Sequence, residues 1–564
     1  MDVSLGATRA RMLLLAGLGV LLGGVGGAAA FVVVRLVGLL SNLALLHQVG
    51  WQLPDLATYH PGPALLGVAA GGALVVALLA RYAPVIKGHG IPEALEAITL
   101  RESRISPRAA LAKPLSAAIA MGTGGPFGAE GPIIVTGGSV GSLVGQLIPV
   151  SAAERRILLA TGAAAGMAGV FGTPVAAVLL AFELLVLERS LRALLPLLVS
   201  TSLATALHDV LLGGRPLFAL RHSVAVPTHE LWLFALLGVA AGLLAALLDR
   251  GLFLFEGGFA RLGVPEFFHP LIGALGFAAI GFAVPGSLSV GYWAIADAVN
   301  GSFALHVALV LFVAKLFSWW IALASNTSGG TLAPMFLIGA TMGEAVGIGF
   351  AHAFPDWHIQ PAAFALVAMG ATFGVGARAL LTGAVFAVEV TGGFGLVVPI
   401  LISLAVAEVV AEQLLAERIM TDRLFRRGYR VELDAQVHPL RSAVCGQVMV
   451  PLEPGQPPPR GPVVDRHAYL ESASALLSGT GATVAVVIDR GVPCGTIDRR
   501  VLEQVVLAGV AERRPQPPQL APPLLGRRRS RRPSSAEDEA CSCASRTTEA
   551  ACGFEAMPVA EERN

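Results

Sequence analysis

Gly128-Ala129-Glu130-Gly131-Pro132 is the most informative stretch of this chain. Two similar segments accompany it, Gly88-His89-Gly90-Ile91-Pro92 and Gly329-Gly330-Thr331-Leu332-Ala333-Pro334. Each is rich in glycine, ends in proline and leads into an apolar stretch. Proline suits the first position of a helix, because the amide that it lacks would have no partner there. Each segment therefore predicts a loop that enters a helix at its N-terminal end.

Such helix ends carry free backbone amides and about half a positive charge. Glycines let a ligand approach the backbone closely, so three converging ends would form an anion site without arginine or lysine. The three segments lie inside membrane-type sequence. The pattern therefore indicates an anion site at membrane depth.

The composition is that of a polytopic membrane protein. The chain has 564 residues, of which 55% are hydrophobic and only 14% charged, and its mean hydropathy is +0.71. These values exclude an ordinary soluble domain. Several apolar runs, such as Leu271 to Val284, are shorter than the roughly 20 residues that a straight spanning helix needs. Short runs interrupted by glycine are typical of transporters with broken helices, although we expect most of the 66 glycines to serve helix packing.

The sequence gives little support for ligands other than a small anion. The net charge of +1 implies no acidic polymer partner, and no basic stripe with aromatic residues suggests nucleic acid. The five cysteines lack the paired spacing of a zinc site, and no Gly-Lys-Ser or Gly-Lys-Thr follows a glycine cluster. We therefore expect no cofactor, metal or nucleic-acid partner.

An internal repeat divides the membrane region, residues 1–430, into halves at about 11–221 and 230–425. Thr173–Leu184 matches Ala379–Val390 and aligns Glu183 with Glu389. Chance likeness between alanine-rich helices is the alternative, but glycine pairs upstream of both segments favour a true repeat. Repeats in transporters are often inverted, with substrate bound where their broken helices meet. We predict an all-α polytopic fold of two inverted-repeat halves with many tilted and broken helices.

The ends of the chain differ from this region. Arginines cluster near residues 9–11, 101–108 and 423–430, which places both termini in the cytoplasm by the positive-inside rule and predicts a multi-pass protein of the plasma (inner) membrane. Residues 431–511 read as a small α/β tail, with strand, turn and strand over 482–497 and a helix after them. This tail resembles one degenerate CBS module. Residues 512–564 have a disordered composition.

Glu130 is the strongest candidate for function. An acid at bilayer depth costs roughly 3 kcal/mol or more. At a helix N-terminus its carboxylate could occupy the anion site when no anion does. Protonation would then free the site and open a gate. The alternative is a solvated loop glutamate.

The three ordered segments resemble the signature motifs of the CLC chloride channel and transporter family, over about residues 30–430. Lys87, Lys113, Glu183 and Glu389 also lie where that family usually has lysine or glutamate. The resemblance implies a homodimer with one chloride pathway per subunit and Glu130 as the gate. It implies an anion site formed by His89, Gly90, Ile91, Gly128, Ala129, Gly131, Thr331, Leu332 and Met420.

Three positions depart from the family pattern. His89 stands where many members have a serine, Ala129 replaces an arginine, and Met420 replaces a chloride-binding tyrosine. His89 could donate a ring N–H to chloride and add charge near neutral pH. The alternative is that only the backbone of this loop serves the anion.

A fourth departure concerns protons. Leu184 stands where exchangers of this family have the glutamate that passes protons from the cytoplasm, and a leucine cannot relay them. Glu183 could substitute on this candidate proton path, although its match is to a structural acid. We therefore favour passive, channel-like chloride conduction, with proton-coupled antiport as the alternative.

Two further functions are weaker alternatives. Some distant relatives export fluoride with altered versions of the same loops. An intramembrane serine hydrolase could use Gly138-Ser139-Val140-Gly141 with His89, but Ser139 lies inside an apolar segment and not on a sharp turn. We expect no enzyme.

Overall fold

A computed structural model describes most of the chain. The described residues are 2–86, 88, 90–101, 103–186, 190–214, 216–426, 440, 445–452, 457–466, 468, 470–489 and 491–511. The chain divides into two compact units, Met1–Gln436 and Val437–Asn564. Lys87, His89 and the predicted disordered tail at 512–564 lie outside the described residues.

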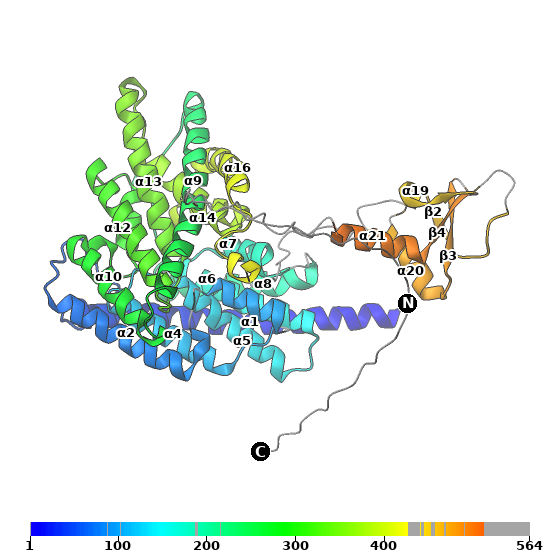
Figure 1. The fold of residues 1–564 in the computed structure, drawn as a ribbon, viewed down its shortest axis with the longest axis horizontal. Coiled ribbons are helices and arrows are strands. Elements are labelled where there is room, and N and C mark those ends of the chain that lie inside the picture. The colour runs from blue at the N-terminus through cyan, green and yellow to red at the C-terminus, as the bar shows by residue number, and fades with distance from the viewer. Residues whose placement is uncertain are drawn as a thin grey trace, which may run out of the picture. The chain divides into compact units, whose positions relative to one another are not determined.

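The first unit is built of helices in two groups. The first group comprises α1 (Asp2–Leu45), α2 (Ala64–Tyr82), α3 (Ile91–Leu100), α4 (Pro107–Gly122), α5 (Glu130–Leu147), α6 (Ala152–Phe171), α7 (Pro174–Leu180), a π-helical turn (Ala181–Leu185) and α8 (Leu191–Leu211). The second comprises α9 (Leu231–Ala260), α10 (His269–Ala283), α11 (Tyr292–Val299), α12 (Leu305–Ala324), α13 (Leu332–Ala353), α14 (Pro361–Ala377), α15 (Leu380–Thr391), α16 (Val397–Leu414) and α17 (Asp422–Arg426). Figure 1 shows the groups beside each other, blue to cyan and green to yellow.

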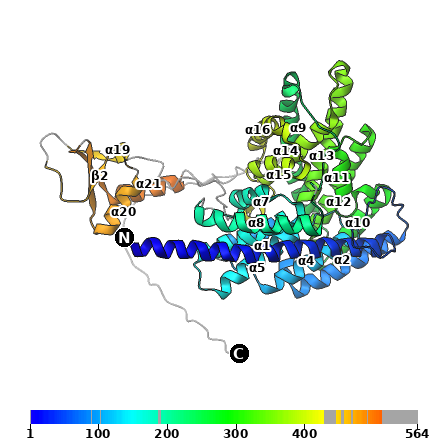
Figure 2. The same cartoon turned by 180° about the vertical axis from the view of Figure 1, so that it is seen from behind.

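The membrane prediction is confirmed. Within the described residues, eight helices are long and apolar enough to cross a membrane. Shorter helices such as α7 and α15 lie among them, because the chain breaks at Gly172–Thr173 and again near Arg378. The apolar stretch 157–185 therefore lies in α6, α7 and the π-helical turn. Figure 2 shows the long α1 running past α4 and α8, and α1 also contacts α6.

Matching glycine stripes pack the central helices of each half. The stripes are Gly137, Gly141 and Gly145 on α5, and Gly339, Gly343 and Gly347 on α13. A Cβ at Gly141 would lie 2.0 Å from the carbonyl oxygen of Leu158 on α6, and one at Gly343 would lie 2.3 Å from that of Phe364 on α14. Helix backbones approach this closely only where glycine faces the partner. The packing explanation for these glycines is confirmed.

Reciprocal helix caps confirm the repeat. The Glu183 carboxylate accepts hydrogen bonds from two amides at the start of α15, at 2.9 and 2.8 Å. Glu389 accepts from two amides at the start of α7, at 3.1 and 2.8 Å. Each half therefore caps a helix of the other half, as two-fold-related halves do. Both acids offset the positive end of the helix that they face.

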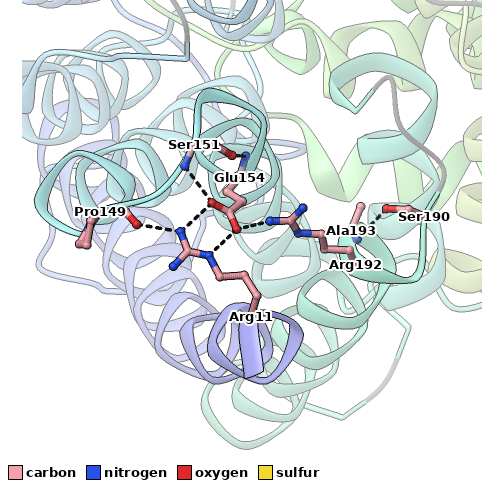
Figure 3. A network of polar contacts seen from close by, with 7 residues as sticks. All are labelled: Arg11, Pro149, Ser151, Glu154, Ser190, Arg192 and Ala193. Atoms are coloured by element: carbon pink, nitrogen blue, oxygen red, sulfur yellow. Dashed lines mark hydrogen bonds and ion pairs between the residues drawn. The ribbon is translucent and has the colours of Figure 1, made fainter. Parts of the chain in front are cut away.

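A polar cluster ties together the beginnings of α1, α6 and α8 (Figure 3). Glu154 is buried and closes a capping box with Ser151 at the start of α6. Arg11 of α1 donates to its two carboxylate oxygens at 2.8 and 3.0 Å, and Arg192 of α8 donates to it as well. The cluster therefore ties the N-terminal parts of these three helices together.

The second unit is a small α/β fold, as predicted. Its elements are α19 (Cys445–Val448), β1 (Val450–Pro451), β2 (Val463–Asp465), α20 (Leu470–Thr480), β3 (Val484–Asp489), β4 (Val492–Asp498) and α21 (Arg499–Ala511). The sheet order is β1-β4-β3-β2, with β2 parallel to β3 and β4 antiparallel to β3. Alternate residues such as Ala485 and Val487 are buried against Leu477 of α20. One β-α-β-β-α unit is described in this part of the chain.

Candidate anion site

The three glycine segments meet in the first unit. Gly128 and Gly330 form an antiparallel backbone pair, with N–H···O distances of 3.1 and 3.0 Å. A Cβ at Gly330 would lie 2.7 Å from the amide nitrogen of Gly131, and one at Gly90 would lie 2.5 Å from the Cα of Gly131. These approaches require glycine. The starts of α3, α5 and α13 therefore converge, as the sequence predicted.

The helices begin earlier than the prolines suggest. Proline was expected at the first helical position, but α5 begins at Glu130 and α13 at Leu332, two residues before Pro132 and Pro334. This expectation is wrong because all amides of the first turn lack a partner within the helix, so proline fits at its third position as well. The two residues before each proline consequently keep amides that the helix itself leaves unused.

Glu130 is fully buried at this meeting point. Its Oε1 accepts a hydrogen bond from the Tyr292 hydroxyl at 2.7 Å. Its Oε2 lies so close to Gly128 that a Cβ there would be 1.7 Å away, and it has no partner with full hydrogen-bond geometry among the described residues. The backbone amides of Glu130 and Ala333 also interact with the carboxylate. The side chain thus folds back over the ends of α5 and α13, where the gating hypothesis requires a charge.

Two buried lysines hold the loops around the site. Lys113 of α4 donates from Nζ to the carbonyl oxygens of Ile86 and Gly88, both at 2.8 Å. Lys315 of α12 donates in the same way, at 3.1 and 3.0 Å, to two carbonyl oxygens in the loop before α11. Lys315 also interacts electrostatically with Glu130. The lysines therefore act through the backbone geometry of the loops and, for Lys315, through charge.

The remaining predicted ligands are placed as follows. Ala129 caps α5, Ile91 begins α3, and Leu332 is buried at the start of α13. The Gly90 amide donates to the Glu93 carboxylate in a capping box, so an acid of α3 itself uses this amide. His89 lies outside the described residues, and its side-chain role stays a prediction.

Two more predicted ligands border the same region. The Thr331 hydroxyl is buried and has no hydrogen-bond partner among the described residues. Met420 is buried just before α17, and α17 contacts α3. A buried hydroxyl without a partner is costly, so Thr331 is available to a ligand. The anion-binding roles of both residues stay predictions.

The candidate proton path contains little that can carry a proton. Leu184 is buried in the π-helical turn, and the Glu183 carboxylate is occupied as the cap of α15. Ser139, from the hydrolase alternative, lies buried in the middle of α5 and not on a turn. Among the described residues, no group of three or more His, Cys, Asp or Glu side chains could hold a metal ion.

Sequence reasoning missed three residues of this site. Ala333 lies within a quoted segment but was not selected as a ligand. Lys315 and Tyr292 were not singled out, although the repeat offered a signal for both. Lys315 corresponds to Lys113, and Ser289-Val290-Gly291-Tyr292 in the second half corresponds to Gly88-His89-Gly90-Ile91 in the first.

Comparisons with known proteins agree with this architecture. A family model described as voltage gated chloride channel matches residues 71–412. The H⁺/Cl⁻ exchange transporter ClcA of Cronobacter sakazakii is 31% identical over 370 residues, which cover 64% of this chain and 78% of that protein. The ClcA of Yersinia pestis is 31% identical over 350 residues, which cover 59% of this chain and 72% of that protein.

Solved structures give the same result. A slow cyanobacterial Cl⁻/H⁺ antiporter superposes with a TM-score of 0.64 at 29% identity, covering 74% of this chain and 98% of that chain. A eukaryotic CLC transporter superposes with a TM-score of 0.61 at 20% identity, covering 87% and 98%. At that identity the second likeness shows the fold alone.

Proposed function

Because the chain belongs to the CLC family of chloride channels and transporters, we propose that it moves chloride across a membrane through the site at Glu130, in exchange for protons. The observation that carries this proposal is the buried carboxylate at the joined ends of α5 and α13. A charge there is costly, so an acid retained at this depth is a candidate functional residue. The same backbone amides that face this carboxylate suit a dehydrated chloride.

The cycle follows from competition between two anions for one place. Charged Glu130 occupies the positive helix ends and excludes chloride. A proton neutralises the carboxylate, which then leaves, and chloride takes its place at the backbone amides. Return of the carboxylate expels chloride and releases the proton. The side chain thereby couples the two ions.

Exchange, and not the channel-like conduction favoured from the sequence, has the support of the named relatives, which are H⁺/Cl⁻ exchangers. Passive conduction stays a second candidate because of one observation. Leu184 is apolar and buried where a proton relay would be needed on the cytoplasmic side. An exchanger built on this chain therefore needs another route for protons to Glu130.

Flux from liposomes tests the proposal. In a chloride gradient, the wild-type protein should drive protons in the opposite direction, and Glu130→Gln should carry chloride without protons and without pH dependence. Glu503→Gln, which changes an exposed acid of the second unit, should behave as wild type. If Glu130→Gln carries chloride with unchanged proton coupling, the proposed role of Glu130 as the gate is wrong. Fluoride and nitrate in the same assay establish anion preference.

Topology is a further part of the proposal. The arginine clusters of the membrane region support cytoplasmic termini. Protease protection of a C-terminal tag in inside-out vesicles would contradict this orientation.

A further inference from the structure

The loop before α11 shares two features with the described residues of the loop before α3. Lys315 donates to the carbonyl oxygens of Ser287 and Ser289, as Lys113 does to the loop before α3. Each loop ends in a glycine with positive φ, Gly90 at 113° and Gly291 at 73°. The residue after that glycine begins the helix in both cases. The second half therefore presents Tyr292 where the first half presents an aliphatic residue.

Tyr292 is held firmly in this place. Its ring packs against Phe171 at 6.1 Å and against Phe218 at 5.6 Å between centroids. Both phenylalanines are buried. Aromatic neighbours on two sides restrict the ring, so the hydroxyl stays directed at Glu130.

A cavity of about 210 Å³ borders this tyrosine. It is lined by Leu53, Pro54, Asp55, Leu56, Leu217, Ser289, Val290, Gly291, Tyr292 and Trp293. The segment 53–56 belongs to the connection between α1 and α2, so the cavity borders a loop region. Tyr292 thus both lines this cavity and donates to the Glu130 carboxylate.

We propose that Tyr292, which also borders this cavity, is a positioning residue that latches Glu130 in the anion site. The inference rests on the proposed function and names a residue outside the predicted set. The phenol hydroxyl donates to the carboxylate, and such a bond is strongest when the acceptor is charged. The latch therefore holds the gate closed while Glu130 is charged and weakens when it is protonated.

Two other charged groups lie near Tyr292 and Glu130. Lys315 of α12 acts on Glu130 electrostatically, and Asp55 lines the cavity beside Tyr292. Lys315 favours the charged carboxylate, as the tyrosine hydroxyl does. Tyr292→Phe removes only the hydroxyl and leaves these charges in place.

The test is the pH profile of chloride flux in liposomes. Tyr292→Phe should move the pH of half-maximal flux upward by about one unit, because a hydrogen bond to a charged group corresponds to about one to two pH units. The shift is upward because the Tyr292 hydroxyl favours the charged Glu130 carboxylate, which closes the gate. Without this donor Glu130 is protonated, and the gate opens, at a higher pH. Phe218→Leu, which loosens the ring but keeps the hydroxyl, should give a smaller shift in the same direction. Tyr82→Phe, which changes an exposed tyrosine, should give none.

The same substitution in a Glu130→Ala variant distinguishes a latch on Glu130 from a direct role of Tyr292 in anion binding. In Glu130→Ala, Tyr292→Phe should leave flux unchanged, since the latch has nothing to hold. A fall in flux in both backgrounds would show a direct anion ligand and overturn the latch, and so would an unshifted pH profile of a folded Tyr292→Phe. If Glu130→Gln itself keeps the wild-type pH dependence, the proposed function fails first. If Glu130→Gln loses it but Tyr292→Phe shows no shift, only the latch fails.

Discussion

Single carboxylates in this protein have different roles because their surroundings differ. Glu130 faces helix ends, but only one of its carboxylate oxygens accepts a hydrogen bond from a side chain. Glu183 and Glu389 face helix ends as well, and both oxygens of each accept backbone amides. An acid whose two oxygens both accept well-formed hydrogen bonds is a stable cap, whereas one whose second oxygen lacks a partner with full hydrogen-bond geometry can exchange partners. We therefore assign movement to Glu130 and structure to the other two.

Glu183→Gln and its repeat partner Glu389→Gln test this distinction. Each should lower the free energy of unfolding by about 1–2 kcal/mol, because a charged cap of a helix N-terminus is replaced by a neutral one. Thermal unfolding in detergent measures the loss, and liposome flux measures coupling. Proton coupling should survive in both variants. If Glu183→Gln alone loses coupling, Glu183 serves as the proton relay.

Helix pairs are positioned by glycine where they approach most closely. The stripes on α5 and α13 occupy equivalent places in the two halves and set the direction of each helix away from the site. The start of each helix, and therefore the position of the amides at Glu130 and Leu332, depends on this packing. A change several turns away can thus affect the anion site.

Gly141→Ala should destabilise the membrane unit by about 1–3 kcal/mol, the usual cost of overpacking, since its Cβ would lie 2.0 Å from the Leu158 carbonyl oxygen. Gly138→Ala is the matched control on the same helix. Its Cβ would meet neighbours at 3.6 Å, an ordinary contact, and alanine favours a helix over glycine. Equal melting temperatures for the two variants would contradict the packing explanation.

The whole membrane unit places its site between two related halves. The Gly128–Gly330 pair joins α5 of the first half to α13 of the second, and Tyr292 reaches Glu130 from the second half. All these residues come from one chain. Each subunit of an assembly would therefore carry its own candidate site.

We predict a homodimer with independent pathways, as the family resemblance implies. Its mass in detergent should be twice that of one chain. Mixed dimers of wild-type and Glu130→Gln subunits should give flux midway between the two parents, because neither site borrows residues from the partner. Flux equal to that of one parent would contradict independence.

The sequence by itself determined the membrane class, the repeat and the three loops that lead into helices, and it singled out Glu130 as the candidate gate. These follow from local chemistry: apolar composition, glycine and proline at helix ends, and an acid in apolar surroundings. Tertiary structure alone decided which groups meet. It placed Tyr292 on Glu130 and paired Gly128 with Gly330, and it used the Gly90 amide for Glu93. These contacts depend on backbone approaches between distant segments, and residue type and spacing along one chain do not specify such distances.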